Sequence, residues 1–460
     1  CFENFSSTLM LQKPSQALKR SPNSRRPMLP PPSLEGLPDE VLRLVVMSFA
    51  PSRWDAVPRL CSTMGVCRRF RDLSTDESLW MALHQQRWQH GRPEGEPPNG
   101  WRADYGRRHG LDASLTPLVR QLLVPETRTA AWKRLMEAGS DVLDAALRQY
   151  AACRTLTDSP YNRELAKVLL GLNQTDVRAR WERLQRRDDL ESTPVEEGAL
   201  LLVAWNLSAA ELVMGPDVKV RGALDELDAL AARLRARLAR ASQTEEAAAT
   251  ATATAAPAAA SPVQVVQTLA VMMFEEEGFC GNRQNYYDPS NSLLDQVLAS
   301  RTGIPISLSV VFAAVCERVG VKLDMIGLPG HFLLATRPTA PGGERVFVDA
   351  FHDGATLDLQ GCEEIVRSYG IAWSAEMSAP VPPSEVWGRM VRNLLNCHKR
   401  NGDAAQVVLH EQLLPHPPPL PVPYPSDEGA RAREEQTMSH AMLQQMLQNI
   451  MQMQMQPPPN

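Results

Sequence analysis

The chain has 460 residues, of which 43% are hydrophobic and 22% charged, and its formal net charge at pH 7 is only -5. This length predicts several domains, and the near-neutral balance argues against nucleic acid or an anionic membrane as the main partner. The eight cysteines are scattered, without a CxxC pair or a Cys/His set at zinc-ligand spacing. We therefore expect a reducing compartment, the cytoplasm or nucleus, and no disulfide framework, zinc site or membrane span.

Residues 1–33 are basic, contain Ser and Pro, and include almost no acidic residue. Such a composition is typical of a disordered tail. Because the chain begins with Cys1 rather than Met, we expect its N-terminus to be incomplete, and a remnant of a transit peptide is the alternative to a plain tail.

Residues 34–90 predict a small helical module. The run Leu37-Pro38-Asp39-Glu40-Val41 opens it, and apolar residues continue at helical spacing from Leu60 to Leu73 and from Trp80 to Trp88. Residues 91–112 are polar and rich in Gly and Arg, and they are predicted to form a connection.

Residues 113–242 predict an all-helical domain. The run Thr193-Pro194-Val195-Glu196 has the pattern of a capping box with Pro at the first helical position, and the leucines from 224 to 238 form a stripe along an Arg-rich helix. Residues 243–262 are of low complexity in Ala and Thr and cannot bury a core. They therefore form either a linker between domains or an insert within one.

Residues 263–375 combine one apolar helix, Val310 to Val321, with short β-type runs, which predicts an α+β domain. The predicted strands are Lys322 to Leu328, His331 to Thr336 and Arg345 to Phe351, and the predicted turns are Pro329-Gly330 and Pro341-Gly342-Gly343.

Residues 376–415 predict a helical hairpin, similar to half of a TPR repeat, whose two helices join at Asn401-Gly402-Asp403. Residues 416–460 are rich in Pro, Gln and Met and predict a disordered tail. The predicted fold class is therefore mainly α with one α+β domain, in a multidomain chain with disordered tails.

Three blocks of the N-terminal module resemble the F-box family: Leu37 to Leu42, Val66 to Leu73 and Asp76 to Trp80. The resemblance implies docking onto a Skp-type adaptor, and through it onto cullin and RING subunits. It also implies that the adaptor contacts are Leu37, Pro38, Glu40, Val41, Leu44, Val66, Phe70, Leu73 and Trp80. An apolar patch on so small a module is normally covered by a partner. The alternative is an ordinary helical hairpin that packs on the next domain.

One pair of residues in the α+β domain has the pattern of a catalytic arrangement. If the hairpin between two predicted strands is symmetric about residue 340, His331 and Asp349 are directly opposed, with Cβ atoms roughly 5 Å apart. A carboxylate in this position can orient the imidazole and select its tautomer. Only a nucleophile would then be missing.

This arrangement resembles the transglutaminase-like superfamily, in which a nucleophilic cysteine lies at the N-terminus of a buried helix. The equivalent stretch, Gly303 to Ser309, contains no cysteine. Cys316 lies more than two turns further along the predicted helix, where we expect it in the core, and Cys280 precedes the helix by too many residues to match. The resemblance therefore implies a pseudoenzyme or an altered chemistry.

A closer resemblance is to the branch of that superfamily that occurs in bacterial Sir-type regulators and in F-box proteins carrying the domain C-terminally. The matching segments are Phe274 to Phe279, Gly281-Asn282, Asn291-Ser292, Leu294 to Leu298, Arg301 to Leu308, Pro329 to Leu334 and Asp349 to Phe351. Residues 195–240 and 384–414 resemble its helical flanks.

Together, these resemblances predict the substrate-recognition subunit of an SCF-type (cullin-RING) ubiquitin ligase. The F-box would bind the adaptor, and the helical and transglutaminase-like region would bind an unknown protein substrate. No catalytic residue, cofactor or metal is required of the chain itself.

Two other functions remain open from the sequence. Ser307 or Ser309, with His331 and Asp349, could form a Ser-His-Asp arrangement in a hydrolase or acyl-transferase. The competing interpretation is that Ser307 caps a helix while the other two form a structural pair. A nucleic-acid regulator is the third candidate, from the four arginines between 233 and 240, although a solvated helix face explains them better.

Overall fold

The computed structural model of the chain describes residues 38–42, 68–93, 95–153, 159–187, 189, 192–215, 217–249, 260–338 and 345–414. The predicted tails, 1–33 and 416–460, lie outside this part. The chain divides into two compact units, residues 1–87 and 88–460, which we describe separately. Among the described residues, no helix is both long and apolar enough to span a membrane.

The first unit is helical in its described part. Residues 39–42 are helical, and helices α3 (Arg68–Thr75) and α4 (Glu77–Arg87) follow. Asp76 separates α3 from α4, and its carboxylate accepts a hydrogen bond from the Ser78 backbone N–H at 2.9 Å. It thereby caps the start of α4.

The second unit begins with a helical core formed by α5 (Gly100–Leu122), α6 (Pro125–Ala138), the 3-10 turn η2 (Gly139–Val142), α7 (Leu143–Cys153) and α8 (Pro160–Gln185). The prediction of a connection over 91–112 is wrong from Gly100 onward. The buried stripe of α5 includes Tyr105, Arg108 and Asp112 before Leu115. Because two of these residues are charged, the first half of the helix carries no apolar periodicity.

The capping box predicted at residues 193–196 is not formed. Helix α9 (Val195–Trp205) begins after Pro194, which is its N-cap residue, and the hydroxyl of Thr193 donates to the Asp189 carbonyl at 3.3 Å instead. A reciprocal capping box occurs at α10 (Ala209–Met214), where Ser208 and Glu211 bond each other's backbone N–H groups.

The low-complexity segment interrupts one packed unit. Helix α11 (Val218–Ala249) extends into it, α12 (Pro262–Ala270) begins at its end, and residues 250–259 lie outside the described part. Leu230 of α11 and Val266 of α12 belong to the same core. The choice between linker and insert is therefore decided in favour of an insert.

The α+β part contains two small sheets. Strands β1 (Cys280–Gly281) and β2 (Thr302–Gly303) pair in parallel, and an antiparallel sheet has the order β3 (Leu323–Ile326), β4 (Leu333–Thr336), β5 (Phe347–Asp349), β6 (Ala355–Leu357). The remaining elements are the π-helical turn η4 (Val271–Glu276), η5 (Pro289–Ser292), α13 (Leu294–Ser300), α14 (Pro305–Arg318), α15 (Leu359–Ser368), η6 (Ala375–Ser378), α16 (Pro383–Arg400) and α17 (Ala404–Glu411). The observed fold class is mainly α with an α+β domain, as predicted.

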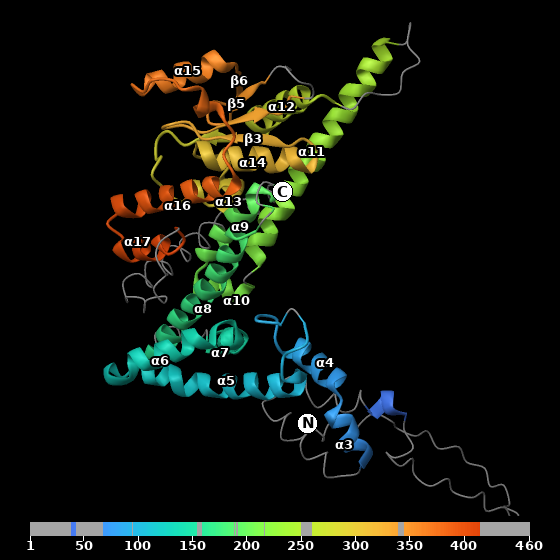
Figure 1. Cartoon of the computed structure of the whole chain (residues 1–460), viewed down its shortest axis with the longest axis vertical. Helices are drawn as coiled ribbons and strands as arrows, with labels where there is room; N and C mark the ends of the chain where they lie inside the picture. Colours follow the sequence, from blue (N-terminus) through green and yellow to red (C-terminus); the bar gives the residue numbers. More distant parts are fainter. Residues whose placement is uncertain are drawn as a thin grey trace, which may run out of the picture. The chain divides into compact units, whose positions relative to one another are not determined.

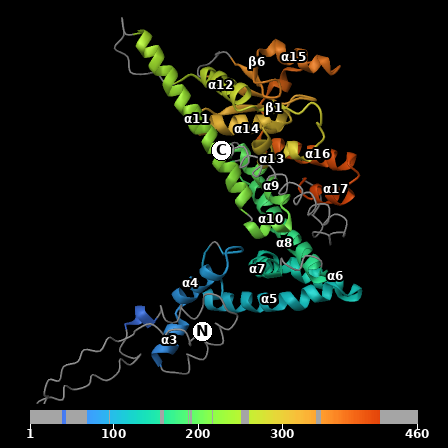
Figure 2. The ribbon, with the colours of Figure 1, turned by 180° about the vertical axis from the view of Figure 1, so that it is seen from behind.

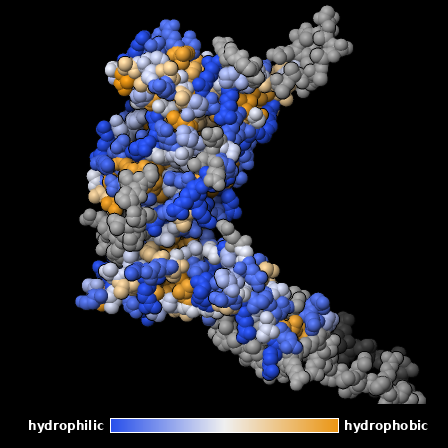
Figure 3. All heavy atoms as spheres, in the orientation of Figure 1, coloured by the Kyte–Doolittle hydropathy of each residue, from blue (hydrophilic) through white to orange (hydrophobic). Residues whose placement is uncertain are grey.

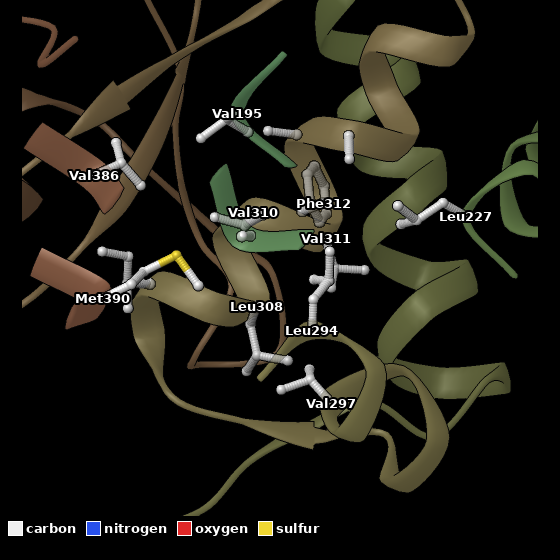
Figure 4. Packing of buried hydrophobic residues seen from close by; sticks show 14 of the residues in the cluster. Val195, Leu227, Leu294, Val297, Leu308, Val310, Val311, Phe312, Val386 and Met390 are labelled. Carbon is white, nitrogen blue, oxygen red and sulfur yellow. The ribbon is translucent and has the colours of Figure 1, made fainter. Parts of the chain in front are cut away.

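Helix α14 is the centre of this part. It begins at Pro305, five residues before the predicted start, and every residue from 305 to 316 is buried. Figures 1 and 2 show it beside α11 and next to the strands, and it contacts α9, α11, α13, β3 and β4. Figure 4 shows its side chains Val310, Val311 and Phe312 in a core that Leu227 of α11 and Met390 of α16 help to form. A helix enclosed on all sides is apolar all round.

The helical hairpin at the end of the described chain forms as predicted. Helices α16 and α17 join at residues 401–403, where Gly402 has a φ of 71°, a left-handed conformation that favours glycine. The indole N–H of Trp387 donates to the Val195 carbonyl at 2.7 Å, and that of Trp181 donates to the Leu413 carbonyl at 2.9 Å. These bonds tie the hairpin to α9 and α8.

Candidate functional site

Among the described residues of the first unit, some of the predicted adaptor contacts are exposed and others are buried. Pro38, Glu40 and Val41 are exposed, with Val41 38% accessible, whereas Leu73 and Trp80 are only 6% and 4% accessible. Leu73 and Trp80 therefore belong to the packed interior and do not form an exposed contact surface. Leu37, Leu44 and Val66 lie outside the described residues, as does the side chain of Phe70.

In the second unit, His331 and Asp349 meet as the sequence predicts, but in a different register. Strands β4 and β5 pair Leu334 with Val348, so Asp349 lies opposite position 333 rather than opposite His331. The register is offset by two residues, and because side chains alternate with a period of two, both still lie on one face. His331 precedes β4, and its Nε2 lies 2.8 Å from Asp349 Oδ2. Both residues are buried.

A second imidazole, which the sequence analysis did not select, completes this cluster. His352 Nδ1 lies 2.7 Å from the same oxygen, Asp349 Oδ2. The other carboxylate oxygen, Oδ1, accepts the backbone N–H groups of Phe351 and His352 at 3.0 and 3.2 Å. The Asp-x-x-His spacing of 349–352 could have indicated this turn.

The environment favours the ionised form of this carboxylate. Burial alone would raise the pKa of Asp349, but the hydrogen bonds and positive charge that His331 and His352 can supply outweigh burial and lower that pKa below its ordinary value. The cluster therefore holds a buried anionic oxygen between two imidazole rings.

Ser307 is engaged elsewhere. Its hydroxyl donates to the Asn291 carbonyl at 2.6 Å and accepts the Ile304 backbone N–H at 3.0 Å, so it closes the first turn of α14. Ser307 is fully buried, and its bonds are to backbone groups rather than to His331. Ser309 is also fully buried, and its hydroxyl has no hydrogen-bond partner within the described residues.

Neither cysteine near this region replaces the missing nucleophile. Cys316 is buried in α14, and burial raises the pKa of its thiol, which keeps it protonated and unreactive. Cys280 is exposed, and its sulfur lies 3.6 Å from the Thr302 hydroxyl. In the described structure, neither thiol is hydrogen-bonded to His331.

The Gly-Asn and Asn-Ser motifs build the loop between β1 and α13. The Asn282 side chain donates to Asn291 Oδ1 at 3.0 Å, and Asn291 Nδ2 donates to the Asn285 carbonyl at 2.8 Å. Gly281 is required because a Cβ there would lie 2.6 Å from the ring of Phe351. These motifs are therefore explained by the folding of the loop and its contact with Phe351.

Aromatic and cationic groups surround the cluster. The ring of Phe351 meets that of His331 edge-on, with centroids 6.3 Å apart, and Tyr286 contacts Phe351 in turn. The guanidinium of Arg389 donates to the backbone carbonyls of Leu328 and His331, both at 3.1 Å. Burial lowers the pKa of Arg389 from its ordinary value. Arg389 thus holds the backbone of His331, and Phe351 packs against its imidazole ring.

The arginines of α11 are paired within the molecule. Arg233 contacts Glu277 at 2.8 Å and Glu226 at 3.2 Å, and Arg237 pairs with Glu276. Arg235 donates to the backbone carbonyl of Arg318. Glu276 and Glu277 are thus intramolecular partners of these arginines, which weakens the case for a nucleic-acid surface on this helix.

Comparison with known proteins agrees with both modules. Residues 34–86 match the F-box-like family, and residues 221–392 match the transglutaminase-like superfamily. The structure and these matches define a chain that carries an F-box-like domain followed by a transglutaminase-like domain, as the motifs predicted.

The chain is also similar to curated proteins. Over 156 residues it is 34% identical to F-box only protein 21 of Mus musculus and 33% identical to that of Homo sapiens, and each alignment covers 33% of this chain and 24% of the relative. Over 129 residues it is 36% identical to a UPF0162 protein of Xylella fastidiosa (strain 9a5c), covering 26% of this chain and 44% of that protein. The chain thus aligns with about a quarter of the F-box relatives' length, and no solved structure matches it significantly.

Proposed function

We propose that this chain is the substrate-recognition subunit of an SCF-type ubiquitin ligase, working in the cytoplasm or nucleus. The observation that carries the proposal is the F-box-like match over residues 34–86, together with the exposed edge Pro38, Glu40 and Val41. Through this module the chain would bind a Skp-type adaptor and, through it, cullin and RING subunits. Ubiquitin transfer would be carried out by those partners.

The transglutaminase-like domain would then act in substrate binding rather than in catalysis. In support, the Ser307 hydroxyl is bonded to backbone groups and Cys316 is buried. Neither residue is hydrogen-bonded to His331 within the described part of the chain. Figure 3 shows that, on the face it draws, hydrophobic residues form small separate areas among hydrophilic ones. A protein substrate with a partly polar interface fits such a surface. No observation specifically favours the Ser-His-Asp hydrolase.

The test is binding of the full-length chain to purified Skp-type adaptor. The variant Pro38→Ala/Val41→Asp changes two exposed residues, so the fold should be retained. Val408→Asp on α17 is the matched control, because Val408 is similarly exposed, at 48% against 38% for Val41. We expect wild type and the control to bind alike, and the double variant to bind about tenfold or more weakly.

Two results would overturn this proposal. Absence of adaptor binding by the wild-type chain would remove the ligase assignment. Equal binding by wild type and the double variant would show that the adaptor does not use the exposed edge on which the assignment depends. Circular dichroism of each variant shows whether its helices are intact.

A further inference from the structure

The cluster of His331, Asp349 and His352 has a property that the ligase proposal does not use. Two imidazole nitrogens, His331 Nε2 and His352 Nδ1, converge on one carboxylate oxygen, Asp349 Oδ2. Both rings therefore contact the same oxygen rather than one carboxylate oxygen each. Convergence of two nitrogens and one anionic oxygen is also the donor set of many metal centres.

We propose that His331, Asp349 and His352 bind one divalent transition-metal ion of the zinc or iron(II) class. The inference is independent of the ubiquitin-ligase proposal, because the F-box-like module on which that proposal depends lies in the first unit.

The spacing of the donor atoms suits such an ion. Ligand atoms about 2.0 to 2.1 Å from a common ion lie about 2.9 to 3.4 Å from one another in octahedral or tetrahedral geometry. Here the two nitrogens lie 2.8 and 2.7 Å from the shared oxygen, and all three atoms are within 4.8 Å of one another. Small rotations of the rings would admit the ion in place of the two hydrogen bonds, provided that each coordinating nitrogen gives up its proton, either to the other nitrogen of its ring or to solvent.

The surrounding structure holds the donors in place. Two backbone N–H groups occupy Asp349 Oδ1, so Oδ2, which the two imidazoles contact, is the carboxylate oxygen placed to bind the ion. Arg389 binds the backbone carbonyl of His331, and the Phe351 ring packs against its imidazole. Partners of this kind orient metal ligands and are a regular part of working sites.

The chemistry of the donors selects the class of metal. Imidazole suits zinc, iron and copper, whereas magnesium and calcium prefer oxygen ligands throughout. The side chain of His352 is 50% accessible while those of His331 and Asp349 are almost enclosed, at 4% and 3%. The ion could enter from the His352 side, where water would complete its coordination.

The sequence alone led to the opposite expectation, that no metal is bound. That expectation depended on ligands spaced closely along one segment. Here the first ligand precedes β4 and the other two lie at the end of β5 and in the turn after it, so only the pairing of these strands brings them together.

The test is isothermal titration calorimetry of ZnCl2 into the full-length, tag-free, chelator-treated chain. His352→Gln removes one nitrogen donor at a half-exposed position. His90→Gln is the matched control, because His90 Nδ1 also bonds a buried carboxylate, Asp144, at 2.9 Å, and that carboxylate likewise accepts two backbone N–H groups. The control pair lacks a second imidazole on its carboxylate oxygen among the described residues.

We expect one Zn²⁺ per chain in wild type and in H90Q, and binding weaker by about tenfold or more in H352Q. Unchanged zinc affinity in H352Q would place the metal elsewhere and overturn the proposal. So would absence of zinc binding by wild type, which would leave the cluster as a hydrogen-bonded group only.

A second measurement does not depend on any variant. Wild type loaded with Co²⁺ should show visible ligand-field absorption that excess Zn²⁺ abolishes and excess Mg²⁺ does not. X-ray absorption of the zinc-loaded chain should show two imidazoles in the coordination sphere. Sulfur ligands, or fewer than two imidazoles, would contradict the proposed donor set.

Discussion

Substitution of Gly198 by alanine should destabilise the second unit, although alanine is the better helix former. Gly198 lies inside α9, and a Cβ there would be 2.5 Å from Cγ and Cε2 of Trp387 and closer still to Cδ2. Ordinary contact begins at about 3.4 Å. The indole ring would therefore have to move by at least about 0.9 Å, the difference between these two distances.

The ring has little freedom to make that movement. Trp387 is fully buried, packs against Trp181 with ring centroids 6.2 Å apart, and donates its N–H to the Val195 carbonyl at 2.7 Å. Overpacking of this kind costs about 1 to 3 kcal/mol, and a weakened hydrogen bond costs about 1 kcal/mol more. The gain in helix propensity returns about 1 kcal/mol. We expect a net loss of about 1 to 3 kcal/mol.

The assay is urea unfolding of the full-length chain, followed by circular dichroism. Gly222→Ala on α11 is the control, because Gly222 is exposed and a Cβ there meets nothing within 4 Å. The control should raise the free energy of unfolding by about 0.5 to 1 kcal/mol. If G198A were as stable as wild type or as stabilised as G222A, the packing of α9 on α16 described above would be refuted.

Three further predictions concern polar groups. Asp349→Asn should lower the free energy of unfolding at pH 7 by about 1 to 3 kcal/mol. Because the folded-state pKa of Asp349 is depressed, this loss of stability should be present above about pH 4 and shrink as the pH falls further. A loss that is the same at pH 7 and pH 3.5 would contradict this prediction. Ser307→Ala should lower the thermal midpoint, since it leaves the Asn291 carbonyl and a buried backbone N–H without their partner, and an unchanged midpoint would show that the hydroxyl contributes nothing. Burial tends to lower the pKa of His90, but the hydrogen bond to Asp144 raises this pKa overall. The stability difference between wild type and His90→Gln should therefore be largest below about pH 6.5 and fall as the pH rises above that value. Urea unfolding at pH 5.5 and pH 9 measures this difference.

The sequence predicted the modules well because their signals are local. The Leu-Pro-Asp-Glu opening and the motif around Arg301 to Leu308 each lie within a few residues, and both domains they indicate are matched by known families. The hairpin at residues 401–403 likewise depends on a Gly that takes a left-handed conformation, which can be read from the sequence.

The predictions failed where a polar residue takes a buried position. The polar, Gly- and Arg-rich composition of residues 91–112 predicts a connection, whereas the first half of α5 is helical and has Arg108 and Asp112 in its buried stripe. Arg108 donates to backbone carbonyls, including that of His90 at 2.9 Å, and Asp112 accepts the Trp88 indole N–H at 3.2 Å. Apolar periodicity does not detect a helix face that is satisfied by hydrogen bonds to other segments.

The sequence by itself thus determined the two domain families, the presence of His331 and Asp349 in one hairpin, and the absence of a cysteine at the start of α14. Only the tertiary structure decided that the strands pair two residues out of the expected register, that Ser307 bonds to the backbone, and that His352 joins the carboxylate. The physical reason is that side chains alternate between the two faces along a strand, so the sequence position determines the face on which a side chain lies. The register of the hairpin and the contacts across that face depend on the turns and packing of segments far apart in the chain.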